Sequence, residues 1–220
     1  MGVRCEIQDG VAILRMDDGK ANAFSFAMLE ELGAALDAAE KDARAVVLLG
    51  RPGRFSGGFD LAVMNEGGAA TARLVTGGAR LALRLFELPL PVVIGCTGHA
   101  LAMGAVLLCA ADLRIGAAGA FKIGLNEVAI GLALPAFAIE LARERLAASH
   151  LQRATALAEI YDPDGAVAAG FLDRAVAPEQ VEAAALEAAA ALGALPGRAH
   201  ALTKRALRRA AIERIRSGLG

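Results

Sequence analysis

One short stretch sets the interpretation of the whole chain: Arg54-Phe55-Ser56-Gly57-Gly58-Phe59-Asp60-Leu61. It follows an apolar run, Ala45–Leu49, which predicts a buried strand that ends at Gly50. Two adjacent glycines after a strand allow backbone angles that other residues avoid, and they let a ligand approach the main chain. Such a turn can direct a free N–H, for instance that of Phe59, at an anionic oxygen. The pattern is equally typical of a tight turn without chemistry.

A second stretch has the same character. The apolar run Val92–Cys96 predicts another buried strand, which ends near Gly98 and is followed by an apolar helix over 103–111. The first N–H groups of a helix have no partner inside it, and the helix dipole adds partial positive charge there. The free N–H at this turn belongs to Met103. Two converging amides of this kind form an oxyanion hole, which holds an enolate or a tetrahedral oxyanion.

Length and composition narrow the classes of function. The chain has 220 residues, which indicates one domain with a substantial core. Hydrophobic residues make up 56%, charged residues 21%, and the formal net charge is -1. This charge balance argues against a nucleic-acid partner and against binding to an acidic membrane. Because no N-terminal signal and no apolar run of membrane-spanning length is found, we expect a soluble, cytoplasmic protein without a membrane partner.

Metal, thiol and hydrolase motifs are not supported. Cys5, Cys96 and Cys109 are widely spaced and form no zinc spacing with the histidines, so no metal site is expected. Cys96 and Cys109 lie in apolar runs, which favours a role as small buried hydrophobic residues. The chain has no GxGxxG after its first strand and no Walker A motif. Ser56 does not lie in a GxSxG nucleophile elbow.

Strands alternate with helices along the chain, which places it in the α/β class. Ser25 is expected to cap the first helix, a glycine-rich segment at 67–71 to be a loop, and Pro135 to open a later helix. Strands are expected at 11–16, 45–49, 92–96, 113–116, 120–123 and 172–175. A first helix is expected to begin after Ser25 and to end at about residue 41. Further helices are expected at 74–88, 103–111, 136–146, 163–169, 179–192 and 200–215.

Four motifs, in this order along the chain, resemble those of one enzyme family. They are Lys20-Ala21-Asn22-Ala23-Phe24, the stretch 55–61, the pair 98–104 and 111–115, and Ile123-Gly124-Leu125-Asn126-Glu127. These motifs resemble those of the crotonase (enoyl-CoA hydratase/isomerase) superfamily. The first motif resembles the acyl-CoA loop of that superfamily, and the second and third resemble its two oxyanion signatures. The fourth motif resembles its glutamate-bearing turn. The resemblance covers residues 3 to about 180, and the set of motifs is specific although each motif alone is weak.

The resemblance implies a fold, a substrate class and an assembly. We expect a crotonase-like spiral of ββα units (the ClpP/crotonase fold) over 1–180. A C-terminal helical region, short for the family, is expected over 181–220. The implied substrate is an acyl-CoA thioester, so that coenzyme A is part of the substrate and no separate cofactor is expected. The implied assembly is a homotrimer or a dimer of trimers.

Site residues follow from the same resemblance, position by position. Phe59 and Met103 supply the backbone amides of the oxyanion hole, and Glu127 is the catalytic carboxylate. A methionine stands where the family usually has a glycine at the second amide; its backbone can still donate a hydrogen bond, while its side chain narrows the site. The residues implied in binding substrate or CoA are Lys20, Ala21, Ala23, Gly57, Gly58 and Asp60.

One departure from the family pattern bears on the reaction. Hydratases of the family carry a second glutamate where this chain has Val106. Adding water across a double bond calls for two carboxylates, whereas moving the double bond requires one base. With Glu127 as single base, the chain most resembles the Δ3,Δ2-enoyl-CoA isomerases. The alternatives are an enoyl-CoA hydratase of fatty-acid β-oxidation, or another crotonase reaction, and a non-catalytic acyl-CoA-binding relative.

Several charged residues have a second interpretation. Burial of Glu127 among Ile123, Val128 and Ile130 is expected to raise its pKa. Asp60 is also a plausible helix cap. His99 is more typical of a packed, hydrogen-bonded histidine, with a reserve role in proton transfer. Arg51 and Arg54 flank the first glycine turn, as CoA contacts or as solvated residues. The basic last helix, with Lys204, Arg205, Arg208 and Arg209, is expected to be a solvent face, with contact to CoA phosphate or to a partner subunit as alternatives.

Overall fold

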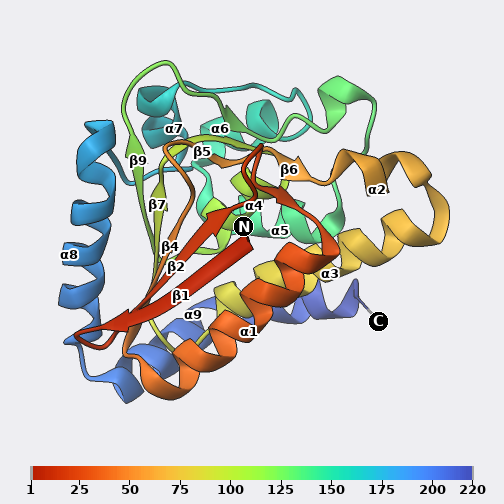
Figure 1. Ribbon diagram of the computed structural model, residues 1–220. Coiled ribbons are helices and arrows are strands. Elements are labelled where there is room, and N and C mark those ends of the chain that lie inside the picture. Colours follow the sequence, from red (N-terminus) through yellow and green to blue (C-terminus); the bar gives the residue numbers. More distant parts are fainter. Residues whose placement is uncertain (1, 220) are drawn as a thin grey trace.

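A six-stranded sheet forms the centre of the molecule, in a computed structural model that describes residues 2–219 (Figure 1). Its strand order is β1-β2-β4-β7-β9-β11. β1 pairs with β2 in antiparallel fashion, and the other neighbours are parallel. The strands are β1 (Gly2–Gln8), β2 (Val11–Asp17), β4 (Ala45–Leu49), β7 (Val92–Cys96), β9 (Leu113–Ala117) and β11 (Arg174–Val176).

Shorter strands follow the long ones and build two smaller sheets. β5 (Gly53–Ser56), β8 (Gly98–Leu101) and β10 (Ile123–Gly124) form a parallel sheet of order β10-β8-β5. β3 (Ala23–Phe24) pairs with β6 (Gly58–Phe59). Three times in succession a strand of the large sheet, a strand of the small sheet and a helical segment follow one another. The expected α/β class and the spiral of ββα units are confirmed.

Helices cover both faces of the large sheet (Figure 1). α8 packs on the face that carries Ile13, Val47 and Val93, while alternate residues such as Leu14, Leu48 and Ile94 face the larger core on the other side. This alternation explains why β4 is apolar throughout, since both of its faces are buried. The helices are α1 (Phe26–Asp42), α2 (Leu61–Glu66), α3 (Gly68–Glu87), α4 (Met103–Ala110), α5 (Ala136–Arg145), α6 (Ala148–Ala154), α7 (Pro163–Ala169), α8 (Val181–Gly193) and α9 (Gly197–Ser217), with 3-10 turns η1 (Val128–Ile130) and η2 (Pro178–Gln180).

Most predicted elements are present, with one clear error. Ser25 caps α1 as expected, since its Oγ accepts a hydrogen bond from the N–H of Met28 at 3.2 Å. The predicted loop at 67–71 is wrong, because α3 begins at Gly68 and continues through this segment. Gly67 and Gly68 take positive φ angles of 68° and 56° and make the turn between α2 and α3. Among the first residues of α3 only Gly68 is a poor helix former, and the prediction of a loop gave too little weight to Ala69 and Ala70, which favour a helix.

Other differences are small. The strand expected at 120–123 lies at Ile123–Gly124, and β1 and α6 were not predicted. α8 packs on the sheet and α9 packs against α3 and α5, while the boundary drawn at residue 180 stays a prediction. Within residues 2–219, no helix has the length and apolar character needed to cross a membrane.

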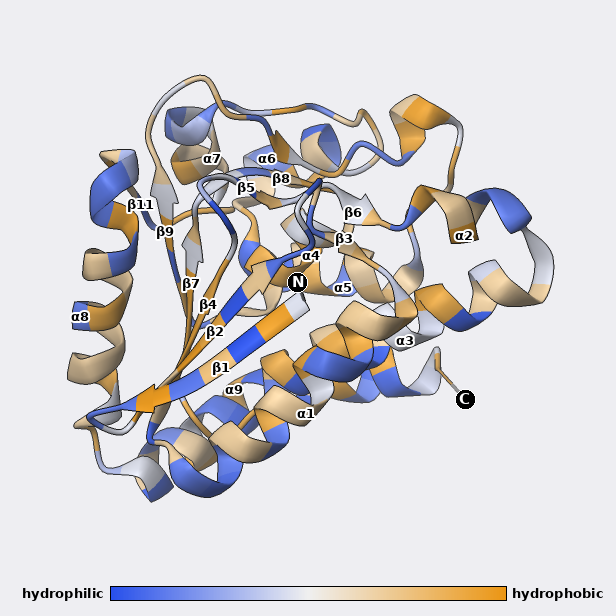
Figure 2. Cartoon of the chain, viewed as in Figure 1, coloured by the Kyte–Doolittle hydropathy of each residue, from blue (hydrophilic) through white to orange (hydrophobic). Residues whose placement is uncertain are grey.

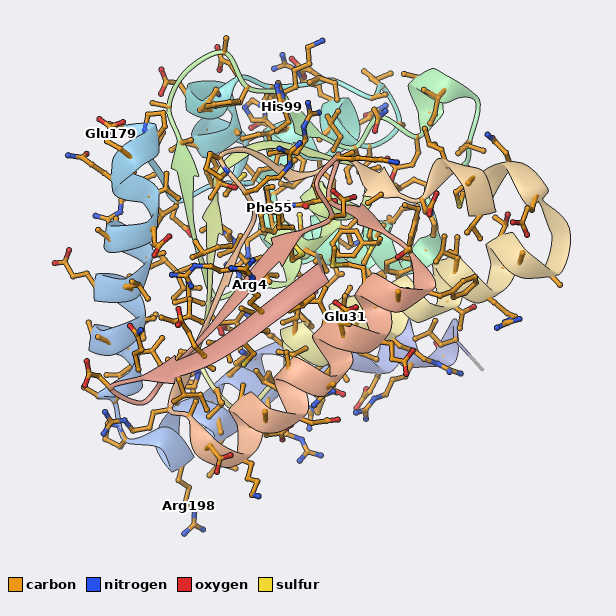
Figure 3. All side chains as sticks on the ribbon, viewed as in Figure 1. Arg4, Glu31, Phe55, His99, Glu179 and Arg198 are labelled. Atoms are coloured by element: carbon orange, nitrogen blue, oxygen red, sulfur yellow. The ribbon has the colours of Figure 1, made fainter. Side chains whose placement is uncertain are left out.

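The last helix, α9, is not the solvent face that its basic composition predicts. Figure 2 shows hydrophilic residues along α9, and Figure 3 shows Arg198 pointing away from the molecule. Lys204 and Arg208, however, are only 6% and 7% exposed. The Nζ of Lys204 lies 2.6 Å from Asp112 Oδ2, and a guanidinium nitrogen of Arg208 lies 2.8 Å from Asp112 Oδ1. Pairing with a carboxylate is what permits the burial of these two cations.

Candidate active site

The first glycine turn leaves one main-chain N–H free of the sheet. Gly58 has a φ of 102°, and its N–H donates to Ser56 Oγ at 3.1 Å. The N–H of Asp60 donates to the carbonyl of Phe24 in β3 at 3.2 Å. Because successive N–H groups of a strand point to opposite sides, the N–H of Phe59 points away from β3. It is therefore available to a ligand.

The second turn presents another such group at the start of α4. Ala102 takes a φ of 49° and a ψ of -122°, which is unusual for a residue with a side chain. Strain of this kind, of order 1–3 kcal/mol, is typical of functional turns. Ala102 is held in place because its N–H donates to the carbonyl of Gly124 at 3.0 Å. Met103 is the first residue of α4, so its N–H has no acceptor within the helix, and the helix dipole points the same way.

The structure brings these two turns into contact. A methyl group built on Gly58 would lie 2.9 Å from Cβ of Ala102 and 3.6 Å from the nitrogen of Met103. A methyl group on Gly104 would lie 2.9 Å from the carbonyl oxygen of Ser56. Both glycines are thus required by close approach of the backbones. The two turns that the sequence singled out separately form one continuous wall.

The loop that contains Lys20, Ala21 and Ala23 is docked against the first turn. The carbonyl of Ala21 accepts a hydrogen bond from the N–H of Gly57 at 2.8 Å. The guanidinium of Arg51 donates to the carbonyl of Lys20, with Nε at 2.9 Å. Arg51 thus holds the main chain of this loop, a role that the sequence analysis did not assign. The loop, Gly57 and Gly58 are brought to the same side of the site.

Asn22 organises this loop and was missed as a structural residue. It is fully buried, with a φ of 51°. Its Nδ2 donates to the carbonyls of Met16 at 3.0 Å and Phe55 at 3.2 Å, and its own carbonyl accepts from Ser56 Oγ at 2.7 Å. Asparagine tolerates positive φ better than most residues, which was the available signal. Since the hydroxyl of Ser56 is engaged in this way, Ser56 is not a nucleophile.

Asp18 completes the loop from the other side. Its carboxylate accepts hydrogen bonds from the N–H groups of Lys20, Asn22 and Ala23, at 2.6, 2.8 and 2.9 Å. Burial alone would raise the pKa of Asp18, but these main-chain donors and the nearby Arg51 hold it below its usual value. The carboxylate therefore remains ionised and fixes the loop.

Glu127 is tied to the second turn through β10. It follows Gly124 by three residues, and the carbonyl of Gly124 is the one that holds Ala102. Burial raises the pKa of Glu127 above its usual value, although a hydrogen bond from its own N–H acts in the opposite direction. Within the described part of the chain, its Oε2 is buried without a hydrogen-bond partner, and so is Oδ1 of Asn126. Unpaired buried polar atoms of this kind are expected where a ligand binds.

The surroundings of Glu127 differ in part from expectation. Ile123 is 1% exposed, as predicted, whereas Val128 and Ile130 in η1 are 43% and 56% exposed. The prediction that burial raises the pKa of Glu127 is confirmed, while the part of Val128 and Ile130 in that burial stays a prediction.

Two further residues have structural roles. Asp60 Oδ1 accepts from the N–H of Ala62 at 2.9 Å and caps α2, as predicted. His99, labelled in Figure 3, accepts a hydrogen bond at Nδ1 from the N–H of Lys122 at 3.0 Å and packs edge-on against Phe121. Burial, and then the positive charges of Arg54 and Lys122, lower the pKa of His99. The interpretation of His99 as a packed, hydrogen-bonded histidine is confirmed.

Two of the three cysteines are unsuited to act as nucleophiles. Cys96 and Cys109 are buried, and burial raises the pKa of each thiol to about 12, so neither forms a thiolate at neutral pH. Their predicted role as small buried residues is confirmed. Among the residues that the structure describes, no group of His, Cys, Asp and Glu side chains could hold a metal ion.

The predicted site would combine two amide donors with a carboxylate of raised pKa, and the roles of these residues stay a prediction. The amides of Phe59 and Met103 lie on turns that touch, and Glu127 is attached to the second turn. A carboxylate with a raised pKa is a suitable base near neutral pH, and amide donors stabilise the anion that proton removal creates. The arrangement suits removal of a proton next to a carbonyl group.

Comparison with known proteins gives the family. The family model for enoyl-CoA hydratase/isomerase matches residues 6–218. The chain belongs to the enoyl-CoA hydratase/isomerase family. A human mitochondrial enoyl-CoA delta isomerase is 33% identical over 211 residues, which are 94% of this chain and 70% of the human protein. The expected crotonase resemblance and crotonase fold are confirmed, and the chain is an enzyme of this family.

Solved structures of the enoyl-CoA hydratase/isomerase family superpose on nearly the whole chain. A Mycobacterium tuberculosis protein, named an enoyl-CoA isomerase in one solved structure and a probable enoyl-CoA hydratase in another, matches with a TM-score of 0.95 and 44% identity, over 99% of this chain and 95% or 92% of the other. An enoyl-CoA hydratase from Mycobacterium marinum matches with a TM-score of 0.95 and 43% identity, over 99% and 96%. Proteins with both names are equally similar, so the choice of reaction rests on the site.

Proposed function

We propose that this enzyme is a Δ3,Δ2-enoyl-CoA isomerase that uses Glu127 as its single base. The observation that carries the proposal is the apolar side of the site. Val106 lies one helical turn beyond the proposed amide donor Met103, is 2% exposed and offers no proton-transferring group. Hydration needs a second carboxylate to orient and deprotonate water, whereas isomerisation does not.

The proposed reaction begins with a 3-enoyl thioester whose carbonyl oxygen accepts hydrogen bonds from the N–H groups of Phe59 and Met103. The carboxylate of Glu127 removes a proton from C2, and the electrons of the C–H bond form an enolate. The two amides stabilise its negative oxygen. The enolate then collapses: the oxygen re-forms the thioester carbonyl, the C1–C2 π electrons move to C2–C3, and the C3–C4 π electrons take the proton from Glu127 at C4. Glu127 is returned to its ionised state.

The coenzyme A part of the substrate is proposed to bind across the docked loop. Lys20, Ala21 and Ala23 lie on that loop, and Gly57 and Gly58 adjoin it through the hydrogen bond between Gly57 and Ala21. The close-packed main chain there offers a flat surface to an extended pantetheine chain. Asp60 is proposed to contribute through its capping of α2 rather than through its charge. No cofactor besides the thioester itself is required.

We also propose that the chain assembles as a homotrimer or a dimer of trimers. Supporting this, Leu195, Leu202 and Leu207 in the C-terminal helical region are 48%, 59% and 78% exposed. Large exposed leucines on one region are typical of protein contact surfaces. Light scattering after gel filtration tests this proposal. A mass of one chain at micromolar concentration would contradict it.

Turnover of defined thioesters tests the proposed reaction. Purified protein given 3-hexenoyl-CoA is expected to yield 2-hexenoyl-CoA of unchanged mass. Glu127→Gln is expected to reduce kcat by about 10²–10⁴-fold, because the base is lost while shape is kept. A brisk gain of 18 mass units from crotonyl-CoA, on the order of the isomerisation rate, would show that the single-base proposal is wrong.

A hydratase is the second candidate, because proteins of that name are as similar as the isomerase in structure. The isomerase and hydratase reactions place different requirements on position 106. An isomerase tolerates other apolar residues at this position, whereas a hydratase would need water to be held by some other group. Comparing wild type with Val106→Leu on both substrates separates them: isomerisation that survives with no hydration in either protein favours the isomerase.

A further inference from the structure

Two adjacent glycines, Gly77 and Gly78, interrupt the middle of the long helix α3. Glycine is less favourable than alanine inside a helix, so a pair in the interior calls for a packing reason. The two residues face different neighbours. A methyl group on Gly77 would lie 2.9 Å from Cδ1 of Leu29, the far end of a flexible side chain in α1.

Gly78 faces the candidate active site instead. A methyl group there would lie 2.4 Å from Cζ and 2.5 Å from Cε1 of Phe59, and 3.3 Å from Cε of Met103. These are the two residues whose main-chain amides the proposed function uses. The bare Cα of Gly78 is therefore a point at which α3 touches the side chains on both halves of the oxyanion hole.

We propose that Gly78 is a positioning residue that sets the distance between α3 and the two amide donors. This inference rests on the proposed function, because it concerns the same pair of amides. Phe59 and Met103 can pack under α3 only while position 78 carries no side chain. A side chain there forces the ring of Phe59 outwards, and the short link from ring to backbone transmits that shift to the N–H of Phe59.

The size of the overlap indicates the size of the effect. Carbon atoms in ordinary contact lie about 3.5–4.0 Å apart, so the ring has to move by roughly 1 Å or more. Amide donors in an oxyanion hole act at about 2.7–3.1 Å, and loss of one donor costs about 10²–10³ in kcat. A shift without complete loss is therefore expected to lower kcat by about tenfold or more.

Gly77→Ala is the matched control for Gly78→Ala. Both add one methyl group to adjacent positions of the same helix and both raise helix propensity. The added methyl at position 77 meets only the end of the Leu29 side chain, which can change rotamer. Gly77→Ala is expected to keep the isomerisation kinetics of the wild type. General stiffening of α3 would affect both variants alike.

A second background tests the route of the effect. Leucine at position 59 keeps the main-chain amide but lacks the ring atoms that collide with a methyl group at 78. The cost of Gly78→Ala, measured as a ratio of kcat values, is therefore expected to be much smaller in Phe59→Leu protein than in wild type. An equal cost in both backgrounds would overturn the proposal, because the collision would then be irrelevant.

The experiment measures kcat and KM for 3-hexenoyl-CoA and affinity for acetoacetyl-CoA in wild type, both alanine variants and the Phe59→Leu pair. Acetoacetyl-CoA ionises to an enolate without turnover, so its binding reports the amides even if the wild type fails to isomerise and the proposed function is wrong. We expect Gly78→Ala, and not Gly77→Ala, to lower kcat and weaken this binding about tenfold, with the fold retained by circular dichroism. Wild-type kcat or wild-type acetoacetyl-CoA affinity in Gly78→Ala would overturn the inference.

Discussion

Glu127 holds a carboxyl group that the fold places in a costly position. One of its oxygens is buried without a partner, and burial raises its pKa. A raised pKa means that the folded state favours the protonated form. The stabilising contribution of this group is thus fully present below the pKa of an unfolded glutamate, and it is lost as the pH rises through the folded-state pKa.

Replacing Glu127 by glutamine is expected to separate activity from stability. Activity is expected to fall, because the base is gone, while the free energy of unfolding at pH 7.5 is expected to stay the same or rise, because no buried charge has to form. Urea unfolding of both proteins measures this. Clear destabilisation of Glu127→Gln would show that the carboxylate has a structural partner, and would weaken the case for catalysis.

The pH dependence of wild-type isomerisation gives a second residue-scale prediction. The base must be ionised to remove a proton, so kcat/KM is expected to fall on the acid side through one ionisation. Its midpoint is expected above 4.5, the ordinary value for glutamate, since burial raises the pKa of Glu127. A profile flat down to pH 4.5 would contradict the assignment of Glu127 as base.

At this scale, sequence reasoning makes predictions where a residue acts through its main chain or belongs to a motif. Glycine turns and a helix start pointed to Phe59 and Met103, and the family motif pointed to Glu127; their roles stay predictions. Asn22 belongs to one of the motifs, but its structural role was not predicted. That role depends on hydrogen bonds to strands that are distant in the sequence. Gly78 gave no signal either, since its role depends on which ring lies above it.

At the scale of elements, ion pairs connect α9 to the chain just beyond the C-terminal end of α4, the helix that begins at Met103. α4 starts at Met103 and ends at Ala110, directly before Ala111 and Asp112. The carboxylate of Asp112 binds Lys204 and Arg208 of α9 and also accepts from the N–H of Val92 at 2.8 Å. Arg208 further stacks on the ring of Phe86, 4.4 Å from its centre. Cations beside the C-terminal end of a helix are favoured by its dipole.

This cluster predicts unequal effects of its members. Asp112→Asn leaves two buried cations without their carboxylate and is expected to lower the free energy of unfolding by about 3–5 kcal/mol. Lys204→Met leaves Asp112 paired with Arg208 and is expected to cost much less. Burial, opposed by the charge of Asp112, lowers the pKa of Lys204 to about 8. Keeping the charged form of Lys204 buried therefore costs free energy, and this cost disappears in Lys204→Met. Urea unfolding compares the two variants, and equal losses would contradict the scheme.

The error about α9 has a physical origin. The helix α9 carries seven Lys and Arg residues, and a charged helix is usually solvated. Arg205 and Arg209 are indeed exposed, while Lys204 and Arg208, four residues apart on one face, are buried. That face can be buried because Asp112 and the carbonyls of Phe86 and Leu90, all distant in the sequence, accept hydrogen bonds from the two cations. The spacing of Lys204 and Arg208 could have shown that they share one face of the helix, but it could not have identified Asp112 as their partner.

For the whole molecule, the fold was largely predictable because its signals are local and repeated. Buried parallel strands such as β4 and β7 appear as unbroken apolar runs, and each is followed by a glycine-bearing turn and a helical segment. The boundaries of α3 and the existence of β1 were less predictable. The pair Gly67 and Gly68 hides the start of α3 although alanines follow it, and β1 is an edge strand with mostly exposed residues.

The arrangement of the site is a property of the whole molecule, because three successive ββα units contribute to it. The first unit supplies Phe59, the second Met103 and the third Glu127. Hydrogen bonds between the small strands fix the position of each unit relative to the next, as does the bond from the N–H of Ala102 to the carbonyl of Gly124. A spiral fold of this kind therefore brings turns that are distant in the sequence into contact, as at Gly58, Ala102 and Gly124.

A crystal structure with bound acetoacetyl-CoA tests the central claim most directly. The account predicts the thioester oxygen about 2.7–3.1 Å from both the Phe59 and the Met103 nitrogen, with the Glu127 carboxylate facing C2 of the acyl group. A thioester oxygen bound by other donors, or a Glu127 side chain turned towards solvent with C2 facing an apolar wall, would contradict it.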